Sequence, residues 1–314
     1  MKNHSRILLK ILDELSSEHG LAMKTYAKDW IVALEKSEKT TFVMGYDWDI
    51  NGAATQQIAK DKCATYEILS ANGIAAVEHF LMLTPEDLHF VNNNRGNWSD
   101  LLNFASQYDF QLVVKPNTGT GGVDVLRITN SVDLEIFTHQ LLKSYKSLAF
   151  CQLLDIQNEY RVVLLDNELQ LIFNKTRPYI VGDGVHPLGE LLTQQNYPIS
   201  MVQSKDFAKK LTMDYCPKMG EKIELNWKHN LAYGATPIDA IDSQLVQPLL
   251  QLAKKAASAI QLRFGSVDIV EVNGQYKVLE INSGVMLESY SNYSLKNYEK
   301  AKTIYERVLM KIFN

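Results

Sequence analysis

Near the end of the chain, three side chains with oxygen ligands stand at a spacing that suits a metal ion: Asp268, Glu280 and Asn282. They belong to the segment SVDIVEVNGQYKVLEIN, in which Asn-Gly at 273–274 predicts a β-hairpin. Side chains alternate along a strand, so Glu280 and Asn282 lie on one face. Carboxylate and amide oxygens are the ligands that Mg²⁺ prefers, with phosphate oxygens completing its octahedral coordination.

The register of this hairpin decides whether Asp268 joins the other two. A two-residue loop sets Glu271 opposite Tyr276. A three-residue loop instead pairs Glu271 with Lys277 and Asp268 with Glu280, so that unlike charges meet and apolar residues meet apolar residues. We therefore predict the three-residue loop and a shared metal-binding face, the alternative being that these are solvated strand residues.

A glycine-rich segment earlier in the chain is suited to binding phosphate. The predicted strand 111–115 ends in Lys115 and runs into PNTGTGGV. Glycines allow backbone N–H groups to approach phosphate oxygens, and the lysine adds a positive charge. The segment lacks both the Gly-Lys-Ser/Thr of a Walker A loop and the GxGxxG pattern. An ordinary hairpin turn is the alternative, and the segments that follow favour phosphate binding.

The composition is that of a folded cytoplasmic enzyme. The 314 residues are 46% hydrophobic and 22% charged, which predicts two or three subdomains. A net charge of -4 does not indicate nucleic acid or an anionic membrane as a partner. The three cysteines are widely spaced, which is typical of reduced thiols, and the first residues form an amphipathic pattern that does not resemble a signal peptide.

The apolar periodicity defines the elements that must position these residues. It predicts helices over 3–36, 53–72, 131–144, 243–262 and 295–313, and strands over 40–45, 111–115, 126–129, 148–154, 160–165, 169–174 and the two arms of 266–282. Antiparallel hairpins interleaved with helices favour α+β architecture over a doubly wound parallel sheet.

Three further segments, taken with the glycine loop and the hairpin, resemble the ATP-grasp superfamily. They are KTRPYIVGDGVHPLGEL at 175–191, NLAYGATPIDAID at 230–242, and the Glu-x-Asn motif with its following residues at 280–284. Their order is similar to that in the branch that contains cyanophycin synthetase and bifunctional glutathione synthetase. The resemblance covers about 59–286 and departs from the family pattern at His229 and Ala235.

The resemblance implies an α+β ATP-grasp fold, in which two α+β subdomains clasp ATP, preceded by a reduced N-terminal region. The implied divisions are a reduced region at 1–58 and an ATP-grasp domain at 59–314, the latter made of linker and entry helices at 59–110, an ATP-binding subdomain at 111–165 and a metal and substrate subdomain at 166–314.

The resemblance also implies a role for each residue that matches a family motif. The residues implied to bind ATP are Lys62 and Lys115 at the phosphates, Gly119, Gly121 and Gly122 in the phosphate lid, Gln152 and Leu154 at adenine, and Glu159 at the ribose. The implied catalytic residues are Arg161, Arg177 and Asn230, and the implied ligands of two Mg²⁺ ions are Asp268, Glu280 and Asn282.

The implied activity is that of an ATP-dependent carboxylate–amine ligase that forms an amide or peptide bond through an acyl phosphate. Its expected partners are amino acids or peptides, with Mg-ATP as cosubstrate, without nucleic acid or membrane, and with a homodimer as the expected assembly. Two alternatives remain open at this point: a small-molecule kinase on the same fold, and a non-catalytic nucleotide-binding module.

Overall fold

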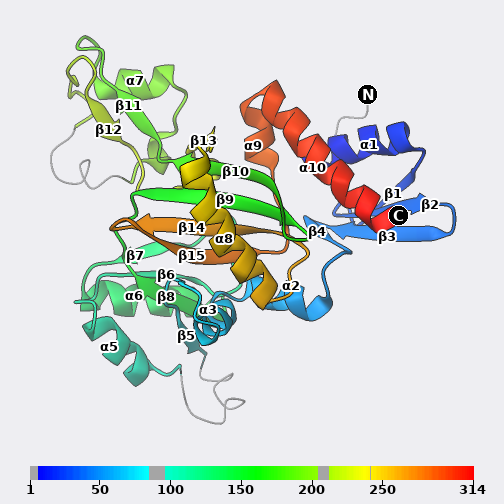
Figure 1. The fold of residues 1–314 in the computed structure, drawn as a ribbon. Helices are drawn as coiled ribbons and strands as arrows, with labels where there is room; N and C mark the ends of the chain where they lie inside the picture. The colour runs from blue at the N-terminus through cyan, green and yellow to red at the C-terminus, as the bar shows by residue number, and fades with distance from the viewer. Residues whose placement is uncertain (1–5, 85–95, 204–211, 241) are drawn as a thin grey trace.

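The computed structural model describes residues 6–84, 96–203, 212–240 and 242–314. Figure 1 shows a central sheet with a second sheet below it, a small N-terminal sheet beside it and helices packed around them. The arrangement confirms the predicted α+β class. Among the helices in the described part of the chain, none is long and apolar enough to cross a bilayer.

The N-terminal unit is a helix followed by an antiparallel sheet. Its elements are α1 (Ile7–His19), β1 (Ala22–Tyr26), β2 (Ile31–Lys36), β3 (Lys39–Met44) and β4 (Asp47–Trp48), in the sheet order β1-β2-β3-β4. The predicted helix over 3–36 is therefore wrong beyond His19. Gly20 ends it in the left-handed conformation, with φ of 64°, and its backbone N–H closes the last turn on the carbonyl of Ser16.

The second unit contains the glycine-rich segment. Its elements are α2 (Ala53–Lys60), α3 (Lys62–Ala71), β5 (Phe80–Leu83), α5 (Trp98–Ser106), β6 (Leu112–Pro116), β7 (Leu126–Ile128), α6 (Ser131–Leu142) and β8 (Ser147–Gln152), with the sheet order β5-β8-β6-β7. The helix predicted over 53–72 is broken at Asp61, whose extended backbone ends α2 and whose side chain caps α3 by accepting a 2.8 Å bond from the N–H of Ala64.

The central sheet is antiparallel throughout and has the order β13-β10-β9-β14-β15. Its strands are β9 (Asn158–Leu165), β10 (Glu168–Thr176), β13 (Thr236–Asp239), β14 (Phe264–Val272) and β15 (Gln275–Asn282). The remaining elements are β11 (Tyr179–Val181), α7 (Leu188–Gln194), β12 (Lys222–Glu224), α8 (Ser243–Ala259), α9 (Glu288–Tyr293) and α10 (Leu295–Phe313), with short 3₁₀ turns at Ile199–Met201 and Leu231–Tyr233. Because β9 pairs with β10, this sheet crosses the predicted subdomain division at 165.

The two faces of the central sheet differ in what covers them. One face packs against α8, α2 and α3 through an apolar core that includes Val162 and Ile269. On the other face, Val163 and Phe264 belong to a core shared with α1, α10 and the N-terminal sheet. Arg161 lies two residues before Val163 and so shares this second face, beyond the edge of that core. The second face is thus half covered, and its uncovered half carries charged side chains.

The hairpin of β14 and β15 differs from the predicted register near its turn. Val272 pairs with Gln275 and Glu271 with Tyr276, so the loop is the two-residue Asn273-Gly274 and the predicted three-residue loop is wrong. A β-bulge between Asp268 and Ile269 then shifts the register by one residue, because Leu279 is the extra residue on β15. Asp268 consequently does lie opposite Glu280, as predicted.

Candidate active site

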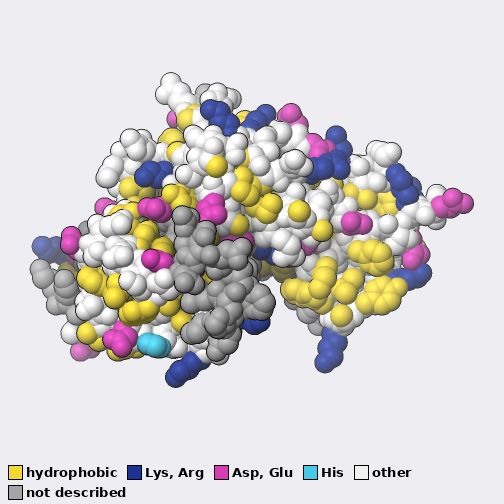
Figure 2. Space-filling model, turned by 90° about the horizontal axis from the view of Figure 1, so that it is seen from below, with side chains coloured by type: hydrophobic (Ala, Val, Ile, Leu, Met, Phe, Trp, Pro, Cys, Tyr) yellow, Lys and Arg dark blue, Asp and Glu magenta, His cyan; other side chains and the backbone are white. Residues whose placement is uncertain are grey.

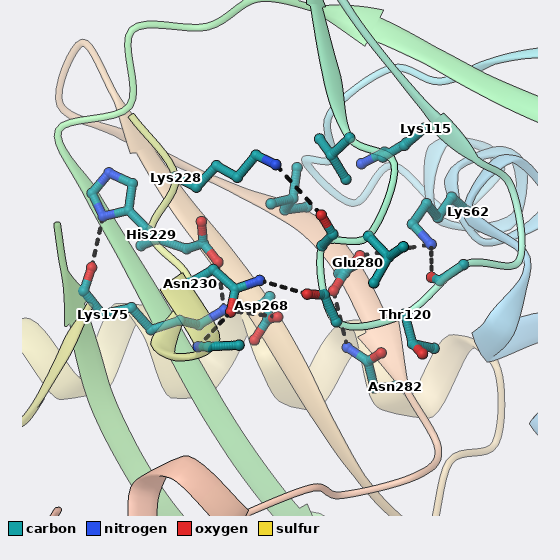
Figure 3. A pocket seen from close by; sticks show the side chains of 18 of the residues that line it. Lys62, Lys115, Thr120, Lys175, Lys228, His229, Asn230, Asp268, Glu280 and Asn282 are labelled. Atoms are coloured by element: carbon teal, nitrogen blue, oxygen red, sulfur yellow. Dashed lines mark hydrogen bonds and ion pairs between the residues drawn. The ribbon is translucent and has the colours of Figure 1, made fainter. Parts of the chain in front are cut away.

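A cavity of about 1110 Å³ lies between the β5–β8 sheet and the uncovered half of the central sheet. All the site residues that the sequence predicts line this one cavity: Lys62, Lys115, Gly119, Gly121, Gly122, Gln152, Leu154, Glu159, Arg161, Arg177, Asn230, Asp268, Glu280 and Asn282. Figure 3 shows several of them converging from both sides. Their individual roles stay predictions, while their convergence is a feature of the fold.

Glu280 and Asn282 form the oxygen-rich part of the cavity wall. The side-chain amide of Asn282 donates a 3.3 Å bond to Oε1 of Glu280, and Nζ of Lys62 lies 3.9 Å from Oε2. The carboxylate keeps 26% of its side-chain surface exposed, so it can accept further partners. A carboxylate beside an amide oxygen, open to a cavity, fits the hard ligands that Mg²⁺ takes.

Asp268 is fully buried and is bound by two cations. Arg161 donates 2.8 Å bonds to both carboxylate oxygens, and Nζ of Lys175 donates a 2.9 Å bond to Oδ2. Burial alone would raise the pKa of Asp268, but the two cations outweigh it and hold the pKa well below its ordinary value. A carboxylate oxygen can accept two hydrogen bonds. Oδ2 already accepts two, whereas Oδ1 accepts one and so retains one acceptor position for a metal ion.

Lys175 also forms an ion pair with Glu159, which is buried beside it. Burial raises the pKa of Glu159, with Lys175 opposing and Asp268 adding to the rise. In this structure the Glu159 carboxylate is therefore engaged by Lys175, while the predicted ribose contact stays a prediction. The cluster holds three carboxylates, Glu159, Asp268 and Glu280, against three cations, Arg161, Lys175 and Lys62.

Sequence reasoning missed Lys175 as a member of the site, although a signal for it exists. β10 contributes its odd-numbered residues to the second face, because Leu171 and Phe173 belong to the core there. Continuing that alternation places Lys175 on the same face, directly after the buried Phe173. In the sequence, Lys175 stands out only as the first residue of the segment 175–191.

Two side chains that line the cavity, from Lys62 and Asn230, bind the backbone of the glycine loop. Nζ of Lys62 donates a 2.6 Å bond to the carbonyl of Gly119, and the side-chain amide of Asn230 donates a 2.9 Å bond to the carbonyl of Gly121. Gly122 has φ of 73°, and a Cβ there would lie 2.4 Å from Nδ2 of Asn230. The left-handed φ favours glycine at this position, and the missing side chain lets the Asn230 amide lie against the loop.

The far end of the cavity is apolar. Val113 and Cys151 of the second unit meet Val270 of the central sheet in one buried cluster, with Leu154 and Leu279 packed against it. One backbone group here already has a hydrogen-bond partner, because the N–H of Leu153 donates a 2.8 Å bond to the carbonyl of Gln111. Val113, Leu154 and Leu279 also line the cavity, so this part of its wall is apolar. Adenine recognition near Gln152 and Leu154 stays a prediction.

Arg177 and His229 fix one another at the cavity wall. Nε of Arg177 donates a 2.9 Å bond to Nε2 of His229, so the opposite ring nitrogen carries the hydrogen and donates a 2.7 Å bond to the carbonyl of Lys175. Burial lowers the pKa of His229 to about 4, and the adjacent Arg177 contributes to that shift. His229 is therefore neutral at physiological pH and orients Arg177.

This histidine predicts a pH dependence of stability. The ordinary pKa of an unfolded histidine is 6.5, and the pKa of His229 in the folded protein is about 4. At a pH between these two values the unfolded chain binds a proton that the folded protein excludes. The free energy of unfolding should therefore fall as pH falls through this window, by at most about 3 kcal/mol from this group. Urea unfolding at several pH values should show a shallower slope for His229→Gln than for the unmodified protein, and an unchanged slope would contradict the assignment.

Comparisons with known proteins point in one direction. Residues 221–306 match the RimK-like ATP-grasp domain. The glutathione biosynthesis bifunctional protein of Enterococcus faecalis is 23% identical over 234 residues, 68% of this chain and 29% of that protein. Its counterpart from Clostridium perfringens is 21% identical over 274 residues, 81% of this chain and 34% of that protein. The crystal structure of a bifunctional glutathione synthetase from Pasteurella multocida superposes with a TM-score of 0.58 at 16% identity, covering 95% of this chain and 44% of that one. The chain thus spans less than half the length of each relative.

Proposed function

Because the chain has an ATP-grasp fold whose residues 221–306 match the RimK-like ATP-grasp domain, we propose that it is an ATP-dependent carboxylate–amine ligase. The observation that carries this proposal is that three kinds of groups line one cavity: a glycine loop with Lys62 and Lys115, apolar side chains that include Leu154 and Leu279, and the Glu280–Asn282 pair. We propose amino acids or peptides as its substrates, and a cytoplasmic location in keeping with its free thiols.

The residues present fit magnesium as the companion of ATP. Glu280 and Asn282 would hold one ion through their side-chain oxygens, and Asp268 would be a ligand of a second. When bound, the ions supply neutralisation of the charge on the phosphate oxygens. The chain itself supplies two lysines at the same phosphates, of which Lys62 already bridges the glycine loop and Glu280.

In the proposed reaction, a substrate carboxylate oxygen attacks the γ-phosphorus of ATP, and the bond from that phosphorus to ADP breaks. The amine of the second substrate then attacks the acyl carbon, loses a proton, and expels phosphate. The protein contributes position and charge, since charge spreads over the phosphoryl oxygens in the transition state. Asn230, which bonds the glycine loop, and Arg177 both line the cavity, and we assign them the orientation of the transferred group.

The proposal is tested by ADP release with Mg-ATP over pooled amino acids and dipeptides, followed by mass spectrometry of the mixture. ADP formation that needs both a carboxylate and an amine, with a product lighter by one water than the two substrates together, is the expected result. A product that retains phosphate would replace the proposal with a kinase. ATP binding without ADP formation in any pool that contains both groups would contradict ligation of these substrates.

A further inference from the structure

The N-terminal sheet exposes an apolar face. Tyr26, Phe42 and Met44 are 50%, 48% and 58% exposed. The register places Tyr26, Ile31 and Met44 in one cross-strand row, and Phe42 beside Ala33 in the row after next, so these side chains share a face. The intervening row, which includes Val32 and Val43, points the other way and is buried under α1 and α10. The sheet therefore has one face in the core and one exposed face, on which the apolar side chains stand beside the Lys24–Glu35 ion pair.

The exposed apolar side chains on this face form one contiguous patch. Figure 2 shows hydrophobic side chains collected on the N-terminal unit, beside the hollow that separates it from the second unit. Single exposed apolar side chains are common on proteins, but a contiguous group marks a surface that contacts something else. We call the group Tyr26, Trp30, Phe42, Met44 and Tyr46 the aromatic wall.

The aromatic wall is continuous with the cavity of the candidate active site. Trp30, Met44 and Tyr46 line that cavity together with the glycine loop and Asn282. The sheet is also tied to the chain just after Asn282. Asp47 forms a β-bridge with Gly284, and the hydroxyl of Ser283 donates a 2.8 Å bond to Oδ1 of Asp47. The wall thus borders the end of the cavity at which the proposed reaction occurs.

The wall has a fixed geometry. Trp30 lies directly over the backbone of Gly45, where a Cβ would come within 2.6 Å of the indole ring. The guanidinium of Arg6 lies 5.0 Å from the Trp30 ring centroid and 5.5 Å from that of Tyr46, and it donates a 2.9 Å bond to the carbonyl of Gly45. The hydroxyl of Tyr46 donates a 3.1 Å bond to Glu288. These contacts hold the rings in place before any substrate arrives.

A cation and an anion line the cavity together with the aromatic wall. Nζ of Lys60 lies 2.8 Å from Oδ2 of Asp47, and both residues line the cavity. A cation and a carboxylate beside an aromatic surface match an amino acid or peptide that carries an ammonium, a carboxylate and an apolar side chain. In the described part of the chain, the two cations at the wall already have partners: Arg6 is engaged by the rings and Gly45, and Lys24, in the same cross-strand row as Phe42, is paired with Glu35.

We propose that the aromatic wall binds an apolar or aromatic side chain of the amino acid or peptide substrate, with the reacting group directed towards Glu280 and Asn282. This inference rests on the proposed ligase function and specifies its substrate class. Binding energy at the wall would hold the substrate in position for reaction, while selecting against small polar side chains.

The test is equilibrium binding of four dipeptides, Phe-Ala, Leu-Ala, Ser-Ala and Glu-Ala, to the full chain by calorimetry with saturating ADP and Mg²⁺. Phe-Ala and Leu-Ala should bind about tenfold more tightly than the other two, as expected for burying one apolar side chain. Phe42→Ser and Met44→Gln should each remove most of this preference. Ile136→Gln, a matched exposed apolar residue on α6 that is 55% exposed, should retain it.

Two results would overturn the inference. One is equal binding of all four dipeptides, or a preference that survives both wall variants. The other is a dimer in sedimentation that Phe42→Ser dissociates, since the face would then be covered by a second copy. ADP formation from Mg-ATP with the pooled amino acids and dipeptides is measured on the same protein, so a failure of the ligase proposal appears as absent ADP formation or a phosphorylated product, whereas failure of this inference leaves amide formation intact.

Discussion

Replacing Asp268 by Asn should lower the free energy of unfolding by about 3–5 kcal/mol, because it leaves Arg161 without the carboxylate that it pairs with and Lys175 with Glu159 alone. Arg161 and Lys175 both direct hydrogen bonds at this carboxylate, and Lys175 is itself buried. Asparagine keeps the size of the side chain and one acceptor oxygen, so the change isolates the charge. Urea unfolding followed by circular dichroism measures the effect.

The matched control is Asp166→Asn, at an exposed ion pair in which Arg263 lies 2.8 Å away with half its side chain exposed. That change should cost about 1 kcal/mol or less. Lys175→Met should restore part of the lost stability when combined with Asp268→Asn, because it removes the one positive charge that Asp268→Asn leaves in excess in the cluster. Equal losses for Asp268→Asn and Asp166→Asn would show that the buried cluster does not depend on the Asp268 charge.

The sequence allowed much of the site to be predicted because its chemistry is concentrated in a few local motifs. The ATP-grasp fold is confirmed by the family match and by the superposition with glutathione synthetase. Asp268 lies opposite Glu280 as predicted, although for a different reason. Pairing rules favoured a three-residue loop, whereas the protein uses a tight Asn-Gly turn and recovers the register through a bulge at Leu279. A prediction that assumes strict two-residue alternation along a strand cannot detect a bulge, because the bulge adds one residue to a single strand.

Other features depended on tertiary context. The apolar spacing of residues 22–36 reads equally as a helix, and only Gly20, followed by the turn at 27–29 in which Ala27, Lys28 and Asp29 have positive φ, separates α1 from β1 and β2. The role of Lys175 depends on Asp268, which is distant in the sequence and becomes its neighbour through the pairing of β9 with both β10 and β14. The aromatic wall likewise joins the cavity through contacts between residues distant in the sequence, such as the bridge between Asp47 and Gly284 and the bond from Tyr46 to Glu288.

Replacing Glu280 by Gln should reduce ADP formation on the order of 10³-fold while leaving the fold intact. The carboxylate is partly exposed to the cavity, and its contacts are a 3.3 Å bond from Asn282 and an ion pair with Lys62 at 3.9 Å. Glutamine preserves the bond from Asn282 but loses the charge that a magnesium ion requires. The change therefore separates catalysis from stability, unlike the change at Asp268.

Glu271→Gln is the control for this experiment, because Glu271 lies on the same hairpin near its turn, outside the cavity lining, and accepts a 2.9 Å bond from Asn158. Its ADP formation should remain within about twofold of the unmodified protein, since it touches none of the proposed groups. For Glu280→Gln, raising Mg²⁺ should recover part of the lost rate, because the weakened site is filled by mass action. Unmodified ADP formation in Glu280→Gln would remove Glu280 from the proposed metal site and leave the lysines and the glycine loop as the phosphate-binding groups.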